Sequence, residues 1–163
     1  MNIFIGQTEN TGKGIFTKSV IKKGQFVVKF EGELYTLKQL QESKVQNLSD
    51  YSMQIGKDVY LGPGGILNYI NHSCNPNCWV KIVNTSALLF ALKNIQEKEQ
   101  LTYDYSSTMD EDSWELVECK CGSKKCRHRI RDFKYLPKNL QEGYIKKGVI
   151  PDYILQGLTK KKN

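Results

Sequence analysis

Three of the five cysteines in this chain lie within eight residues near its C-terminal end. They occur as Cys119-Lys120-Cys121 and, after four intervening residues, Cys126. Thiolates bind Zn²⁺ at about 2.3 Å, and a closed structural site holds four ligands in a tetrahedron. Gly122 gives the backbone the freedom that a tight turn between ligands needs. The cluster therefore predicts a metal site that fastens this segment to another part of the chain.

The fourth ligand must come from elsewhere, and the residues alone leave four candidates: Cys74, Cys78, His72 and His128. A small buried side chain is the better explanation of Cys78, and a surface residue that of His128. Free thiols or a local disulfide are the competing explanation of the whole cluster. The odd number of cysteines and the lack of a visible signal peptide favour a reducing, intracellular compartment over a secreted disulfide scaffold.

The composition predicts one globular domain. The chain has 163 residues, of which 39% are hydrophobic and 25% charged. No apolar run approaches the roughly 18 residues that a membrane-spanning helix needs, so no membrane partner is expected. The net charge of +7 favours anionic or acidic partners. A nucleic-acid surface explains that charge no better than a solvated surface with a lysine-rich end at 160–162 does.

The periodicity predicts mostly strands, with glycine-rich turns between them. Strands are expected at residues 15–17, 26–30, 79–83, 87–91 and 101–105, and a hairpin is expected over 51–61. Residues 37–48 suit a short amphipathic helix, and the apolar side chains of residues 131–163 suit a helical appendage.

Three further signals are weak when each is taken alone. Gly12-Lys13-Gly14 is typical of a hairpin turn, and Asn71-His72 of a structural turn. In the segment 103–105, alternation along a strand places both tyrosines on one face, with a solvated Asp104 between them. Their order along the chain and their joint presence carry more information than any one of them.

Taken together, these segments resemble a SET-domain protein-lysine methyltransferase with a post-SET zinc motif. Residues 12–16 are similar to the opening GxG segment of that family, and residues 71–77 match its NHSCxPN motif without a mismatch. Residues 99–105 match its ELTYDY-like element, with Gln100 in the usual glutamate position. The spacing of the three clustered cysteines matches the post-SET motif.

The resemblance implies a mainly β fold, a SET-type β-clip of small sheets with a C-terminal pseudoknot. It divides the chain into a SET domain (1–105), an acidic link with the post-SET zinc motif (106–130), and a helical appendage with a basic tail (131–163). It also implies S-adenosylmethionine as methyl donor, a structural Zn²⁺, and a lysine-containing protein substrate such as a histone or another basic protein.

Site residues follow from the resemblance position by position. It assigns catalysis to Tyr105 and Tyr103, cofactor contacts to Gly12, Lys13, Gly14, Tyr51, Asn71 and His72, and metal ligation to Cys74, Cys119, Cys121 and Cys126. A tyrosine rather than phenylalanine at 103 leaves less room for extra methyl groups, which favours mono- or dimethylation. Phe30 is expected to join the two tyrosines as a wall of the lysine channel.

The sequence also departs from the family pattern. Asn68 stands where arginine is common, no cysteine-rich segment precedes the domain, and Trp114 either folds over the cofactor or only packs. Two alternatives therefore stay open: a zinc-stabilised basic module that binds nucleic acid or protein without catalysis, and a SET-like scaffold that has lost its activity.

Overall fold

The computed structural model describes residues 2–46, 48–112 and 117–160. Its strands are β1 (Ile3–Gln7), β2 (Lys13–Thr17), β3 (Phe26–Phe30), β4 (Leu34–Tyr35), β5 (Met53–Gly56), β6 (Val59–Leu61), β7 (Asn71–His72), β8 (Cys78–Val83), β9 (Ser86–Ala91), β10 (Gln100–Tyr103), β11 (Val117–Glu118) and β12 (Arg129–Ile130). Its helices are α1 (Leu37–Glu42), α2 (Lys138–Lys146) and α3 (Asp152–Lys160), with 3₁₀ turns η1 (Gly65–Tyr69), η2 (Tyr105–Thr108) and η3 (Phe133–Tyr135).

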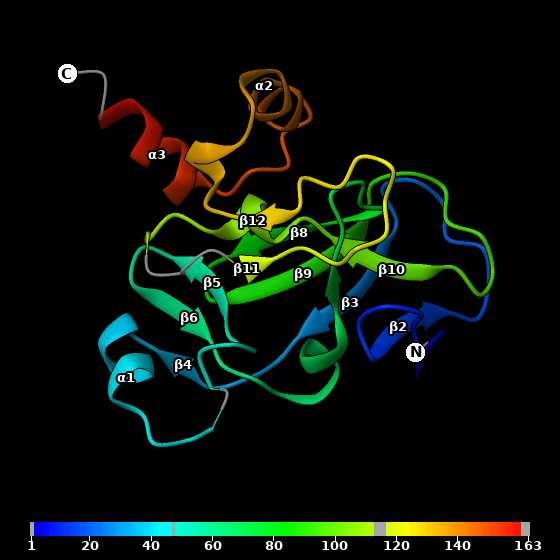
Figure 1. The fold of residues 1–163 in the computed structure, drawn as a ribbon, viewed down its shortest axis with the longest axis horizontal. Helices are drawn as coiled ribbons and strands as arrows, with labels where there is room; N and C mark the ends of the chain where they lie inside the picture. The colour runs from blue at the N-terminus through cyan, green and yellow to red at the C-terminus, as the bar shows by residue number, and fades with distance from the viewer. Residues whose placement is uncertain (1, 47, 113–116, 161–163) are drawn as a thin grey trace.

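The strands form four small sheets, which confirms the predicted mainly β fold (Figure 1). Their orders are β1-β2-β10-β7, β3-β9-β8, β4-β6-β5 and β11-β12. Period-two burial explains why the residues of β3 form a strand, because Val28 and Phe30 are buried while Lys29 between them is exposed.

Strand β10 is the element that assembles the site. It pairs antiparallel with β2, where Leu101 lies opposite Ile15, and parallel with β7, where Tyr103 lies opposite His72. Segments from the start, the middle and the later part of the chain therefore meet in one sheet. Long-range pairing of this kind places the Asn-His turn beside the tyrosine pair.

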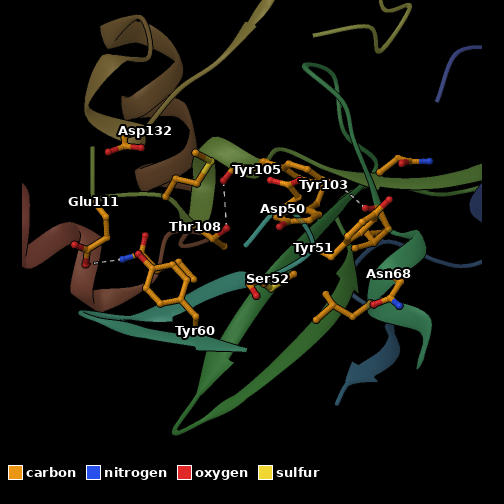
Figure 2. A pocket seen from close by; sticks show the side chains of 16 residues that line it. Asp50, Tyr51, Ser52, Tyr60, Asn68, Tyr103, Tyr105, Thr108, Glu111 and Asp132 are labelled. Atoms are coloured by element: carbon orange, nitrogen blue, oxygen red, sulfur yellow. Dashed lines mark hydrogen bonds between the residues drawn. The ribbon is translucent and has the colours of Figure 1, made fainter. Parts of the chain in front are cut away.

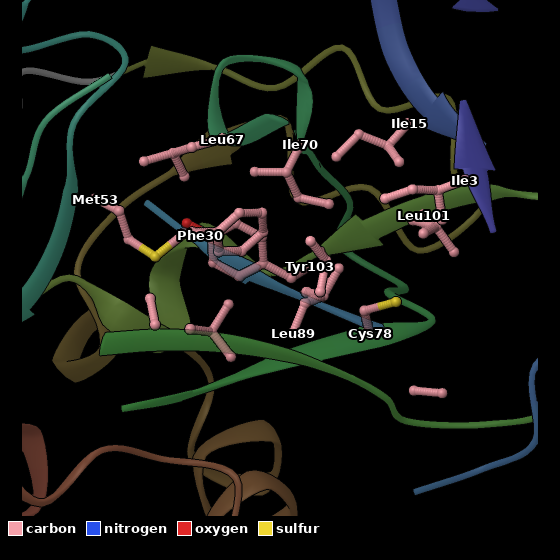
Figure 3. Packing of buried hydrophobic residues seen from close by; sticks show 14 of the residues in the cluster. Ile3, Ile15, Phe30, Met53, Leu67, Ile70, Cys78, Leu89, Leu101 and Tyr103 are labelled. Atoms are coloured by element: carbon pink, nitrogen blue, oxygen red, sulfur yellow. The ribbon is translucent and has the colours of Figure 1, made fainter. Parts of the chain in front are cut away.

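The main core lies between the sheets (Figure 3). Ile15, Leu89 and Leu101 have no exposed surface, and each buried aliphatic side chain of this size contributes roughly 1.5–3 kcal/mol to folding. Phe30 belongs to this core and does not line either cavity described below, so its expected role as a channel wall is wrong. It is only 1% exposed because β3 turns it toward the core.

Two predicted elements are shorter than expected. The helix predicted over residues 37–48 begins with a capping box at Thr36 but ends at Glu42, because Ser43 adopts an extended backbone. The strand predicted over 101–105 ends at Tyr103, since the side chain of Asp104 accepts from the N–H of Ser106 and starts the 3₁₀ turn η2. The two tyrosines consequently do not share one face of a strand.

The C-terminal part of the chain forms the expected helical appendage. Helices α2 and α3 lie on the opposite side of the molecule from α1 (Figure 1). Tyr144 of α2, Ile154 of α3 and Phe133 of η3 belong to a second buried cluster, which packs against Trp79 and Leu92 of the β8-β9 region. Among the described residues, no helix combines the length and apolar character that crossing a membrane requires.

Candidate active site and metal centre

Four cysteines form a compact group of sulfur atoms. The Sγ atoms of Cys74, Cys119, Cys121 and Cys126 all lie within 4.8 Å of one another. Cys78 is buried in the main core, and the side chain of His128 is exposed. Of the four candidates for a fourth ligand, Cys74 is therefore the one that joins the cluster. Four thiols in this arrangement fit the donor set of a structural zinc site.

Backbone N–H groups point at these sulfurs. The N–H of Arg127 donates to Sγ of Cys74 and that of His128 to Sγ of Cys126, each at 3.3 Å. Burial raises the pKa of the Cys74 thiol to about 11. Burial also opposes ionisation of Cys121, but hydrogen bonds from backbone and neighbouring thiols lower its pKa to about 7. A bound cation would favour the thiolate form at all four positions.

An open cleft of about 810 Å³ lies beside this cluster. It is lined by residues 8–11 of the turn after β1, by Asn71 and His72 of β7, by Gln100 and Thr102 of β10, and by residues 120–125 of the cysteine segment. A volume of this order suits a small-molecule cofactor. The cysteine cluster thus holds one wall of the cleft in place.

Gly14 lies at the back of this open cleft. A Cβ atom there would stand 2.6 Å from Nε2 of Gln100, 2.7 Å from Cγ2 of Thr8 and 3.0 Å from Nδ2 of Asn71. Asn71 approaches so closely because its Nδ2 donates to the carbonyl of Lys13 at 2.9 Å. The GxG segment therefore supports the cleft from behind, while residues 8–11 of the same hairpin form its lining.

A second, narrower cavity of about 110 Å³, here called the aromatic cavity, has four tyrosines among the residues that line it (Figure 2). Tyr51, Tyr60, Tyr103 and Tyr105 all contribute to it. The rings of Tyr103 and Tyr105 lie 4.9 Å apart, and the hydroxyl of Tyr105 donates to the carbonyl of Ile70 at 2.5 Å. Burial raises the pKa of both hydroxyls above the ordinary value, so both tyrosines stay protonated.

The open cleft and this aromatic cavity meet at Asn71, which lines both. His72 stands next to that junction, with its ring 5.3 Å from the ring of Tyr105. The N–H of Tyr105 donates to Nδ1 of His72 at 3.1 Å, and Nε2 lies 3.3 Å from Sγ of Cys74. Burial lowers the pKa of His72 to about 4, so the imidazole is neutral and its proton sits on Nε2.

A model of the SET domain matches residues 12–106. The chain belongs to the SET-domain family. The histone-lysine N-methyltransferase trithorax of Drosophila virilis is 32% identical over 127 residues, which cover 71% of this chain and 3% of that protein. The chain therefore spans a small part of this curated relative's length.

Two solved SET-domain structures resemble the fold of this chain with similar TM-scores. KRYPTONITE in complex with mCHG DNA and SAH has a TM-score of 0.65 at 26% identity, covering 80% of this chain and 29% of that one. The methyltransferase domain of human histone-lysine N-methyltransferase SETMAR has a TM-score of 0.64 at 25% identity, covering 80% and 58%.

Within this SET domain, Tyr51 shares the aromatic cavity with Asn71 but not with His72, which the sequence also assigns to the cofactor. Tyr51 lines the aromatic cavity and not the open cleft, whereas Asn71 and His72 line the cleft. Trp114 falls outside the described residues. Asn68, the departure from the family pattern, is exposed and lines the aromatic cavity.

The sequence did not predict the role of Asp104, whose side chain has several partners in the site. Asp104 is 2% exposed rather than solvated, and its Oδ1 accepts from Nη2 of Arg127 at 2.7 Å. The same oxygen lies 3.5 Å from Nδ1 of His72. Removing one partner from a buried ion pair typically costs about 3–5 kcal/mol, so this carboxylate holds the segment firmly. No local pattern distinguishes a buried aspartate from a solvated one between two tyrosines.

Sequence reasoning also missed the charge of the aromatic cavity. Asp50, Glu111 and Asp132 are among its lining residues, which include no lysine or arginine. Glu111 and Asp132 lie on the opposite side from Asn68 (Figure 2). The open cleft differs, since four lysines and two glutamates line it. The two cavities of the SET domain therefore carry opposite charge, which the net charge of +7 conceals.

Proposed function

We propose that this chain transfers a methyl group from S-adenosylmethionine to the side-chain amine of a lysine in a protein. The observation that carries the proposal is the junction of the two cavities at Asn71, beside Tyr105. A donor in the open cleft and a lysine in the aromatic cavity would approach each other from opposite sides. In-line transfer between two bound reactants needs this arrangement.

The open cleft suits the donor in size and in its polar groups. Asn71 and His72 would contact it, while Gly14 lets the side chain of Asn71 stand close to the hairpin. The similarity to a structure solved with SAH, the product that remains after methyl transfer, supports this choice of donor. When bound, S-adenosylmethionine supplies an electrophilic methyl group on a sulfonium.

The aromatic cavity suits a neutral lysine amine. A lysine must lose its proton before it attacks. Contact with the rings of Tyr103 and Tyr105 would desolvate the amine and lower its pKa, against the carboxylates of the same cavity, which raise it. The faces of Tyr103 and Tyr105 favour the methylated ammonium through cation–π attraction, worth roughly 0.5–2 kcal/mol each. The Tyr105 hydroxyl, which donates to the Ile70 carbonyl, would orient the amine at the junction.

The four cysteines would hold Zn²⁺ as a structural ion. Their role is to fix residues 120–125 as one wall of the open cleft. Such a site needs reduced thiols, so we expect the protein to work in a reducing compartment. Residues 1–105 would then form the catalytic domain, residues 106–130 the zinc-bound wall, and residues 131–163 an appendage.

We propose a basic protein such as a histone as the substrate, and mainly mono- or dimethylation as the outcome. The carboxylates Asp50 and Glu111 at the aromatic cavity favour cationic side chains next to the target lysine, whereas Asp132 is buried and pairs with Lys134. The hydroxyl of Tyr103 occupies space that further methyl groups would need. The histone-lysine methyltransferase names of the relatives support the same class of substrate.

One experiment tests the central claim. The purified chain is incubated with methyl-labelled donor and separate pools of histones and other basic proteins, and donor binding is measured by calorimetry. We expect label on lysine, and Tyr105→Phe should lose about 100-fold in turnover while it still binds donor. Transfer without any effect of Tyr105→Phe would contradict the assigned role. A protein that neither binds donor nor transfers label would be a binding module instead.

A further inference from the structure

The residues that follow Tyr103, 104–109, form the wall between the junction and the C-terminal appendage. We call them the catalytic segment. Tyr105, Thr108 and Met109 line the aromatic cavity. On its other side the segment contacts the appendage, where the N–H of Phe133 donates to the carbonyl of Met109 at 3.0 Å. The appendage thus supports the segment directly from behind.

Tyr144 of α2 reaches one end of this segment. Its hydroxyl donates to Oδ2 of Asp104 at 3.0 Å, and both side chains are buried. Arg127 takes the other carboxylate oxygen, Oδ1, which also accepts from the N–H of Ser106 at 3.2 Å. Both oxygens of Asp104 are therefore held, one by the zinc-binding region and one by the appendage.

Asp104 in turn borders the groups at the junction. Its Oδ1 lies 3.5 Å from Nδ1 of His72, the same nitrogen that accepts from the N–H of Tyr105. A shift of this carboxylate would move the start of η2 and with it the Tyr105 ring. The hydroxyl of Tyr144 is thus connected to the junction through one buried side chain.

Tyr153 of α3 reaches the other end of the segment. Its hydroxyl lies 2.6 Å from the carbonyl of Thr108 and 3.1 Å from that of Gln54, and it can donate to one of them at a time. Thr108 and Gln54 both line the aromatic cavity. This single hydroxyl therefore joins η2 to strand β5 across the back of the cavity.

We infer that the C-terminal appendage positions the catalytic segment, with Tyr144 and Tyr153 as positioning residues that touch neither donor nor lysine. The inference rests on the proposed methyl transfer. The match to the SET domain model ends at residue 106, so the family assignment does not itself assign this role to α2 and α3. Two hydroxyl groups, each bonded to one end of this short segment, are enough to fix its orientation.

The test compares Tyr144→Phe with two controls, each made in the 163-residue chain. Tyr135→Phe removes a hydroxyl from the same appendage at a 49% exposed position. Ile154→Val weakens the packing of the appendage at a fully buried position without touching Asp104. Steady-state kinetics, thermal unfolding and amide NMR shifts are measured for each variant, and Tyr153→Phe is measured in parallel.

We expect Tyr144→Phe to lower kcat roughly tenfold while both KM values stay within about twofold, since orientation and not binding is lost. The amide resonances of Tyr105 and Ser106 should shift in Tyr144→Phe and not in Tyr135→Phe. Tyr153→Phe should lower kcat by a smaller factor, because its hydroxyl holds neutral backbone carbonyls and not the carboxylate of Asp104. Ile154→Val should lower the melting temperature and leave kcat unchanged below it.

Two results would overturn the inference. One is a kcat for Tyr144→Phe equal to wild type, or a loss matched by Ile154→Val, since the appendage would then act only through stability. The other is unchanged Tyr105 and Ser106 resonances in Tyr144→Phe. If the wild-type chain transfers no methyl group but these resonances shift, the positioning holds and the proposed function alone fails.

Discussion

The open cleft and the aromatic cavity share Asn71 but differ in size, in charge and in what holds their walls. The cleft measures about 810 Å³ and has four lysines in its lining, whereas the cavity measures about 110 Å³ and has three carboxylates and no cationic side chain. One wall of the cleft is the loop of residues 120–125, which the cysteine cluster holds and whose lysines are exposed. The cavity is instead supported by core strands and by Tyr144 and Tyr153, which come from α2 and α3.

In the proposed reaction the two cavities would keep the reactants apart until they meet. The polar, open cleft would admit a soluble donor, and the narrow aromatic cavity would admit a side chain only after it sheds water. Changes to the cleft should therefore alter donor binding. Changes to the cavity should alter the methylation state or the choice of peptide.

Removing the metal should have the largest effect, because it releases an entire wall of the cleft. Chelation or Cys121→Ser is expected to lower activity at least about 100-fold, with donor affinity falling in parallel. The buried residues of the main core form a cluster separate from that of the four metal-site cysteines, so far-UV circular dichroism should change little. Cys78→Ser, outside the cluster, is the control for loss of a thiol. Activity that survives in metal-free protein would show that the loop holds its place without the ion.

Gly14→Ala should affect the cleft alone. The added Cβ would lie under 3.0 Å from Gln100 and Thr8, and overpacking of this kind costs about 1–3 kcal/mol. We expect donor affinity to fall about tenfold, with the KM for peptide unchanged. Gly143→Ala in α2 is a matched control, since a Cβ there meets no atom within 4 Å. Equal donor affinity for both variants would mean that the hairpin shifts to accommodate the added Cβ without weakening donor binding.

Much of the fold follows from local pattern. Strands predicted at 26–30, 79–83 and 87–91 occur as Phe26–Phe30, Cys78–Val83 and Ser86–Ala91, because β-branched and aromatic residues there alternate or run between clear turn signals. The order of strands in the sheets does not follow in this way. The placement of β10 between β2 and β7 depends on packing between distant segments, which no local period encodes.

In the candidate site, too, some residues could be predicted from the sequence and others could not. Residues with unusual chemistry or spacing, such as the four cysteines and Asn71-His72, could be predicted from motifs, and the structure brings them together. Asp104 and Tyr144 could not. Each is an ordinary residue in its own segment, and only their 3.0 Å contact across 40 positions gives them a role. The acidic lining of the aromatic cavity could not be predicted from the sequence, because its carboxylates come from three separate segments.

Within the aromatic cavity, Tyr103→Phe should change the product more than the rate. Tyr103 is fully enclosed, so removing its hydroxyl adds space where a methylated amine would turn. We expect a shift from mono- and dimethyl-lysine toward trimethyl-lysine, with kcat within about threefold of wild type. Mass spectrometry of the modified peptide measures the product distribution. Tyr60→Phe, another lining tyrosine further from Tyr105, serves as the comparison, and the same shift in both would remove the special role of position 103.

The smallest effect is expected at the rim of the aromatic cavity, where charge rather than shape would select the peptide. Glu111→Gln keeps the oxygen that accepts from Nε2 of Gln54 at 3.0 Å but removes the negative charge. Because a partly exposed ion pair contributes about 0.2–1 kcal/mol, KM should rise about threefold for a peptide with arginine beside the target lysine. A peptide with alanine there should show no change, and added salt should reduce the difference, since screening acts over about 10 Å at 0.1 M. Glu142→Gln on the exposed face of α2 changes the net charge equally and should leave KM unaltered. An equal rise for both peptides would mean that Glu111 shapes the cavity and does not recognise charge.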